Sequence, residues 1–126
     1  MENSIQKFGL TDDTFIRYKK IGNGDPILLL HTFRNRLEYS NFIVPRITDH
    51  YTVYLLDLPG FGENSHLEPV SNIEAMAKFV LDFALANKLR KFDLLGHSMG
   101  GMVAQEIAIS KPENVRKLIL YSTGSI

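Results

Sequence analysis

Four short, mostly apolar runs constrain the fold of this chain most strongly. They are Ile27–Leu30, Val53–Leu56, Phe92–Leu95 and Leu118–Tyr121. A strand with one face in water alternates apolar with polar residues, so continuous runs predict strands that are buried on both faces. Earlier in the chain, Phe15–Tyr18 and the preceding Ile5–Leu10 flank a polar turn and predict a β-hairpin.

Helical periodicity fills the intervals between the later strands. One helical face carries Ile73, Met76, Ala77, Val80, Leu81, Ala84 and Leu85. Ser71 and Glu74 supply a capping box at its start, and a further helix is expected from about Met99 to Lys111, before Pro112. Leu37–Thr48 indicates a weaker helix, with its end left open by Pro45. Strands alternating with helices predict an α/β fold, with a mostly parallel sheet and helices on both faces.

Composition limits the classes of partner. The 126 residues suffice for one core, and the 14 basic and 14 acidic residues give a formal net charge of +0. A balanced charge argues against nucleic acid, and the absence of cysteine excludes disulfides, cysteine nucleophiles and thiolate metal sites. No apolar run approaches the roughly 20 residues of a membrane helix, and Met1–Lys7 lacks the apolar core of a secretory signal. We therefore expect a soluble cytoplasmic protein with no membrane contact.

Gly96-His97-Ser98-Met99-Gly100 is a G-x-S-x-G motif at the junction of an expected strand and an expected helix. Alone the motif is weak, but this junction is the context that its chemistry requires. The residues two before and two after the serine must lack side chains, because the chain bends sharply there. Gly96 and Gly100 meet that need. The bend would present the Ser98 hydroxyl above the sheet and direct the Met99 N–H at developing negative charge.

The motif has two other readings. Gly and Ser are also ordinary turn residues, so a tight strand-to-helix connection without chemistry is one alternative. A phosphate-binding loop is the second, but G-x-x-x-x-G-K-[ST] is absent and no Lys follows Gly101. Acyl transfer is the chemistry that the pattern favours.

The order of motifs resembles the α/β-hydrolase superfamily, in its serine hydrolase branch, over nearly the whole chain. Pro26–Thr32 resembles the strand that enters the oxyanion loop, and 57–62 resembles the D-x-x-G-x-G turn after the next strand. The segment 96–105 resembles the nucleophile elbow with its helix, and Val115–Thr123 the strand that follows. The resemblance implies that residues 1–126 are the N-terminal part of a single domain, truncated after the strand that follows the elbow helix. The lid and the C-terminal strands would be absent.

The same resemblance implies residue roles. Ser98 would be the nucleophile, and the backbone N–H groups of Met99 and Phe33 would form the oxyanion hole. His31 would shape the oxyanion loop, although Thr32 follows it where the family usually has glycine, which leaves Thr32 open as the donor in place of Phe33. In the family the acid and the histidine follow the serine, yet only Glu106 and Glu113 do so here and no histidine does.

Several other polar residues are poor candidates for catalysis or metal binding. His31 and His97 are alternative bases, but the first matches a loop-shaping position and the second adjoins Ser98 in a turn where neighbouring side chains diverge. Asp57 fits an aspartate that bonds its own turn. Asp93 needs a partner if it is buried. His50 and His66 lack further ligands at metal-binding spacing, so we expect no metal and no cofactor.

The sequence thus predicts a serine hydrolase that cleaves a small carboxylic ester, lactone or thioester through an acyl-enzyme. An acyltransferase or a carbon–carbon bond hydrolase could use the same elbow, whereas dehalogenases and epoxide hydrolases usually carry Asp at the nucleophile. A non-catalytic fragment is the alternative outside enzymes. On that reading Leu118–Tyr121 would be left as an exposed apolar sheet edge, so we expect the isolated chain to self-associate or to be poorly soluble. Without a base, the 126-residue chain alone should be nearly inactive.

Overall fold

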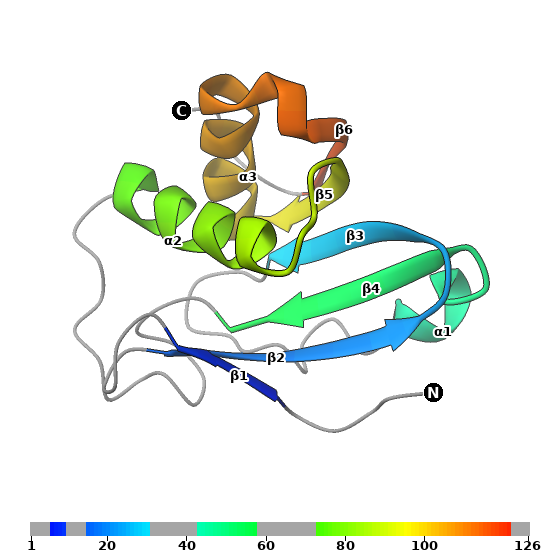
Figure 1. The fold of residues 1–126 in the computed structure, drawn as a ribbon. Coiled ribbons are helices and arrows are strands. Elements are labelled where there is room, and N and C mark those ends of the chain that lie inside the picture. The colour runs from blue at the N-terminus through cyan, green and yellow to red at the C-terminus, as the bar shows by residue number, and fades with distance from the viewer. Residues whose placement is uncertain (1–5, 10–14, 31–42, 58–72, 122–126) are drawn as a thin grey trace.

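The computed structural model describes residues 6–9, 15–30, 43–57 and 73–121, which form one sheet packed against helices (Figure 1). The sheet has six strands in the order β1-β2-β4-β3-β5-β6. The strands are β1 (Gln6–Gly9), β2 (Phe15–Gly22), β3 (Asp25–Leu30), β4 (Tyr51–Leu56), β5 (Phe92–His97) and β6 (Val115–Tyr121). The pairings from β4 through β6 are parallel, and the β1–β2 hairpin joins β4 antiparallel. The mostly parallel sheet and the N-terminal hairpin are therefore confirmed.

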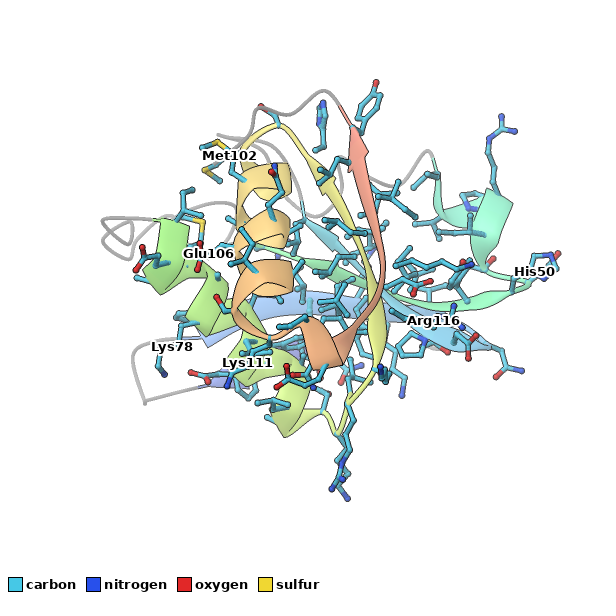
Figure 2. The ribbon with its side chains drawn as sticks, turned by 90° about the horizontal axis from the view of Figure 1, so that it is seen from above. His50, Lys78, Met102, Glu106, Lys111 and Arg116 are labelled. Atoms are coloured by element: carbon cyan, nitrogen blue, oxygen red, sulfur yellow. The ribbon has the colours of Figure 1, made fainter. Side chains whose placement is uncertain are left out.

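Helices cover both faces of this sheet. They are α1 (Val44–Ile47), α2 (Ile73–Ala86) and α3 (Met99–Ser110), followed by a short 3₁₀ turn, η3 (Pro112–Asn114). Figure 2 shows α2 and α3 on one side of the strands and α1 on the other. The parallel crossover from β5 through α3 to β6 is the βαβ unit expected from the alternating patterns.

The continuous apolar runs are explained by two separate cores. Along β3, Leu28 and Leu30 join the cluster under α2 and α3, whereas Ile27 and Leu29 join the cluster under α1. Successive side chains of a strand point to opposite faces, so a strand between two cores must be apolar at every position. Phe83 lies at the centre of the larger cluster, with the ring of Tyr18 at 4.8 Å in an edge-to-face arrangement.

Two of the expected helices differ in detail. The buried face of α2 includes Phe79 and Phe83, which are not among the residues that the helical periodicity assigns to that face. Leu85, which is among them, is exposed. Phe79 and Phe83 are larger than Leu85, and the face of α2 that buries them leaves Leu85 in solvent. Within the described part of the expected helix Leu37–Thr48, only Val44–Ile47 is helical, and residues 37–42 lie outside the described residues. Pro45 occupies the first turn of that helix, where a missing N–H costs no hydrogen bond.

A charged network crosses the amino ends of three parallel strands. The Arg116 guanidinium donates from Nε and from its second terminal nitrogen to the two carboxylate oxygens of Asp93, each at 2.9 Å. Its other terminal nitrogen donates to Asp25 at 2.6 Å. Asp93 is fully buried, so the partner that its burial demands comes from β6. The hydrogen bonds from Arg116 lower the pKa of Asp93 below its ordinary value of 3.8.

The outer strand β6 leaves apolar side chains in solvent. Leu118, Ile119, Leu120 and Tyr121 are 38%, 40%, 42% and 53% exposed. Among the described strands β6 has a neighbour on one side, β5, and forms an edge of the sheet. The exposed apolar edge expected from the sequence is therefore present in the described fold.

The lowered pKa of Asp93 predicts an acid-sensitive fold. A carboxyl group whose pKa is depressed on folding stabilises the protein above its ordinary pKa of 3.8, and this stabilisation is lost as pH falls through the folded pKa. We expect the urea midpoint to fall as pH decreases below about 4. The urea midpoint of Asp93→Asn should be lower than that of the wild type at neutral pH, and it should fall less steeply as the pH decreases. An unchanged pH profile in that variant would contradict the assignment.

Candidate active site

The carboxyl ends of the central parallel strands meet at one edge of the sheet. Leu30, the last residue of β3, pairs with Leu56 of β4 on one side and with Gly96 of β5 on the other. The chain therefore leaves β3 toward β4 and later returns to the opposite side of β3 to form β5. Such a reversal is the topological switch point of an α/β sheet, where ligands bind outside the carboxyl ends of the strands. Ser98 follows β5 directly at this edge.

Ser98 has a strained backbone. Its φ of 56° and ψ of −118° lie outside the helical, extended and left-handed helical regions that L-residues ordinarily occupy. Such conformations cost about 1–3 kcal/mol and persist only where the surroundings enforce them. Here Ser98 joins the end of β5 to the first residue of α3, and its side chain is half-buried. The sharp strand-to-helix bend that the motif requires is present, and it does not enclose the serine.

Gly96 explains how the bend is enforced. A Cβ atom built on Gly96 would lie 2.5 Å from the Gly101 Cα and 2.6 Å from the Gly100 carbonyl oxygen. Both atoms belong to the backbone of the first turn of α3, which no side-chain rotation can move away. The helix therefore begins directly against the strand end, and the chain between them has room for a single reversing residue. Gly100 is itself buried in that first turn.

Backbone hydrogen bonds fix Ser98 on both sides. Its carbonyl oxygen accepts from the N–H of Gly101 at 2.9 Å and from that of Met102 at 3.3 Å, which starts the helix. Its own N–H donates to the carbonyl oxygen of Tyr121, the last residue of β6, at 3.1 Å. The ring of the neighbouring His97 lies 4.5 Å from the ring of Tyr121. The serine is thus held by both the helix and the edge strand.

The expected oxyanion donors fall on different parts of the chain. Met99 is the first residue of α3, where a backbone N–H has no acceptor within the helix, and its side chain packs against the larger core. Phe33 and the loop-shaping His31, together with Thr32, lie outside the described residues. Their roles stay predictions. The described end of this loop is Leu30, whose register partner is Gly96 of the elbow strand.

A buried ion pair lies at the same edge of the sheet, near the end of β4. Arg17 Nε donates to Asp57 Oδ2 at 2.7 Å, and the Asp57 N–H donates to the Arg17 carbonyl oxygen at 3.0 Å. Both side chains are almost completely buried. We expected Asp57 to bond its own turn, and residues 58–62 of that turn lie outside the described residues. The arginine was missed because it is a single charge within a strand whose pairing with β4 is set by the tertiary fold.

The remaining histidines supply no metal site in the described chain. His50 is exposed after α1, and His66 lies outside the described residues. Across residues 6–9, 15–30, 43–57 and 73–121, no group of three or more His, Cys, Asp or Glu side chains could hold a metal ion. Within the same ranges, no helix has the length and apolar character needed to cross a membrane.

A surface hollow of about 640 Å³ lies at the opposite edge from Ser98. Its lining residues are Leu85, Lys88, Arg90 and Asn114. They come from the end of α2 and from segments that precede β5 and β6, so the hollow opens at the amino ends of the parallel strands. It takes no part in the candidate site.

The described geometry suits nucleophilic chemistry at a carbonyl group. A half-buried hydroxyl stands at a strained bend, and the positive end of a 12-residue helix begins at the next residue. Backbone N–H groups at such a position can stabilise a negative oxygen that develops in a transition state. Activation of the hydroxyl additionally needs a general base.

Comparison with known proteins agrees with this geometry. A sequence profile described as "alpha/beta hydrolase fold" matches residues 25–125. The chain is similar to the pimeloyl-[acyl-carrier protein] methyl ester esterase of Klebsiella pneumoniae, with 37% identity over 110 residues, covering 86% of this chain and 41% of that protein. It is also similar to the dihydrolipoyllysine-residue acetyltransferase component of the acetoin cleaving system of Cupriavidus necator. That match is 34% identical and covers 92% of this chain and 31% of the relative.

The fold has a solved counterpart. A membrane phospholipase A, described as a bacterial virulence factor, superimposes with a TM-score of 0.89 at 31% identity. The match covers 96% of this chain and 40% of the phospholipase. In each of these comparisons the chain spans less than half the length of the protein it resembles.

The contact at Gly96 predicts the effect of adding one methyl group. Gly96→Ala should destabilise the fold by about 1–3 kcal/mol, because neither backbone can yield without moving α3 from β5. Urea denaturation measures the change. Ile109→Ala, on an exposed position of the same helix, is the matched control and should change stability by less than about 0.5 kcal/mol. Equal urea midpoints for Gly96→Ala and Ile109→Ala would mean that the backbone of α3 does not approach Gly96 closely.

Arg17 offers a second test, of the buried ion pair. Arg17→Met should cost about 3–5 kcal/mol, because it removes the Arg17 cation from the fully buried Asp57 carboxylate. Lys78→Met breaks an exposed ion pair with Asp82 at 3.0 Å and should cost less than about 1 kcal/mol. Chemical denaturation at neutral pH compares the two variants. A loss at Arg17 no larger than that at Lys78 would refute the importance of burial.

Proposed function

The chain belongs to the alpha/beta hydrolase fold family, and from this premise we propose that Ser98 is the nucleophile of a serine hydrolase that cleaves a small carboxylic ester-type bond. The observation that carries the proposal is the Ser98 backbone at φ 56°, between the end of β5 and the first turn of α3. An ordinary turn serine has no need of that strain, whereas a nucleophile gains an accessible hydroxyl next to a helix N-terminus.

In the proposed mechanism, the Ser98 hydroxyl oxygen forms a bond to the substrate carbonyl carbon as a base removes its proton. The carbonyl electron pair moves onto the oxygen, which accepts hydrogen bonds from the Met99 and Phe33 N–H groups. Collapse of this intermediate breaks the bond to the leaving alcohol or thiol, which takes the proton from the base. Water then attacks the acyl-enzyme in the same way and releases the carboxylic acid.

We propose that the base and its acid partner are supplied by polypeptide outside residues 1–126. No histidine follows Ser98 in this sequence, and the acids after it are Glu106 and Glu113. The family relatives contain at least about twice as much chain, since this sequence covers 31–42% of them. On this proposal the chain is the N-terminal part of one domain, and alone it turns over ester substrates at a negligible rate.

The relatives guide the choice of substrate. The methyl ester esterase from Klebsiella pneumoniae cleaves, by its name, an ester with a small alcohol. We therefore favour an ester of a small alcohol over a lactone or thioester for this chain. Phe33 and Met99 would line the acyl or alkyl pocket. No metal or cofactor enters the proposed reaction.

Acyl transfer is the second candidate. It is favoured by the similarity to an acetyltransferase component from Cupriavidus necator. The same acyl-enzyme would pass its acyl group to an alcohol or thiol instead of water. Adding a competing alcohol during turnover distinguishes the two, because a transferase forms the new ester faster than it forms free acid.

We further propose that the 126-residue chain resides in the cytoplasm and self-associates through β6. The outer edge of that strand offers exposed apolar side chains from Leu118 to Tyr121. Pairing with a second copy in antiparallel register would keep the Arg116 and Lys117 cations of the two strands apart. A parallel arrangement would set these like charges side by side.

The nucleophile is tested in a chain extended to the length of its relatives. Ser98→Ala should lower kcat for p-nitrophenyl acetate by at least about 10³-fold and abolish the initial burst. Ser110→Ala, in the last turn of the same helix, is the matched control and should retain full activity. Turnover equal to wild type in Ser98→Ala would remove Ser98 as the nucleophile.

Self-association is tested on the 126-residue chain by light scattering. We expect a dimer or larger species, which Ile119→Lys should dissociate because it places a charge on the apolar edge. Ile109→Lys, at an exposed position of α3, should leave the assembly unchanged. A sharp wild-type monomer that unfolds cooperatively would contradict the proposal.

A further inference from the structure

The pairing of β5 with β6 contains an irregularity. Phe92 pairs with Val115, but the next register pair is Leu94 with Leu118. The chain advances two residues along β5 and three along β6 between these pairs, so β6 carries one extra residue there. Such bulges are uncommon in parallel pairs, and they change which residues face each other along the rest of the strand.

The Arg116–Asp93 ion pair lies at this bulge. Asp93 is the β5 residue between the two register pairs, and Arg116 is one of the two β6 residues opposite it. The guanidinium bonds both carboxylate oxygens at 2.9 Å, a two-pronged geometry that lysine could not reproduce. Because Asp93 is fully buried, its carboxylate gains strongly from keeping this cation in place.

The extra residue has its effect at the far end of the strand. Beyond the bulge the register continues regularly to His97 opposite Tyr121. The Tyr121 carbonyl oxygen then accepts the Ser98 N–H at 3.1 Å. Without the extra residue, Leu120 would stand opposite His97 and the Tyr121 carbonyl would pass beyond Ser98.

Side-chain burial contributes little to the preference for the register with Tyr121 opposite His97 over the register with Leu120 there. In the central strands a slip of one residue would expose the apolar faces and is strongly disfavoured. In β6 the residues from 116 to 121 are all exposed, and apolar side chains occupy both faces from Leu118 onward. The choice of register therefore depends on specific contacts, and the two hydrogen bonds from Arg116 to Asp93 are a directional contact at the bulge.

We propose that Arg116 is a positioning residue for Ser98, which it holds through the register of β6 rather than by contact. Arg116 stands near the start of β6, and Met102, in the first turn of α3, lies at the opposite end of the sheet (Figure 2). Five residues of strand, about 17 Å, separate Arg116 from the carbonyl that holds the serine. The effect on catalysis rests on the proposed function of Ser98, but the effect on its backbone does not.

Hydrogen exchange measured by mass spectrometry tests the backbone effect. Arg116→Met should raise the exchange rate of the His97 and Ser98 amides by about tenfold, with less than about a twofold change in β3. Asp93→Asn should act in the same direction. Arg116→Lys should recover only part of the protection, because it restores the charge without the two-pronged bond. Lys117→Met, which removes a neighbouring charge of the bulge, is the matched control and should leave exchange unchanged.

The outcomes separate positioning from general stability. An equal increase in exchange rate in β3 and at Ser98 would make the ion pair a stability element and overturn the proposal. Unfolding of Arg116→Met, Arg116→Lys and Asp93→Asn alike would do the same. Full protection in Arg116→Met would overturn it as well. In a catalytically active extended chain, Arg116→Met should lower kcat with KM unchanged. If Ser98→Ala retains activity, the proposed function fails, while the exchange result still decides the role of Arg116.

Discussion

The close approach of two backbones organises this structure. The end of β5 meets the first turn of α3 so closely that position 96 has no space for a Cβ atom. The chain must reverse within one residue, and that residue, Ser98, takes a conformation with positive φ that an unconstrained serine avoids. The strain at Ser98 is therefore the consequence of a packing contact made two residues earlier. Function, as proposed, follows from where that contact leaves the hydroxyl.

The sheet brings the end of β3 to the same edge as Ser98. Strands buried on both faces have little freedom to slip, since any shift would expose one of the two cores. Leu30 of β3 is consequently held beside Gly96 of β5, and the chain after β3 starts next to the elbow. The edge strand β6 lacks that protection, which is why polar contacts matter more in its register than in the register of the central strands.

Charged groups stabilise the two ends of the sheet in different ways. Near the candidate site, Arg17 and Asp57 form a pair that is almost fully removed from water and ties β2 to the end of β4. At the amino ends of the strands, Arg116 joins the buried Asp93 to the exposed Asp25, so three strands share one cation. In both cases a carboxylate at or next to a parallel strand is matched by an arginine that is distant in sequence. The pairings add side-chain links between strands that already share backbone hydrogen bonds and hydrophobic cores.

Local pattern was enough to identify the strands, two of the helices and the elbow, because unalternated apolar runs and the helical period are properties of neighbouring residues. The glycine at position 96 could be interpreted for the same reason, since the need for it arises within a few residues of the bend. The buried face of α2 was assigned less well. Which face of the helix is buried depends on how the large side chains of Phe79 and Phe83 pack against the sheet, and the sequence alone does not describe that surface. The cation that meets each buried aspartate, the bulge that shifts β6 and the carbonyl that holds Ser98 all depend on pairing between segments far apart in the chain. Periodicity reflects only neighbouring residues and does not predict pairings between distant segments, so the tertiary structure alone decides them.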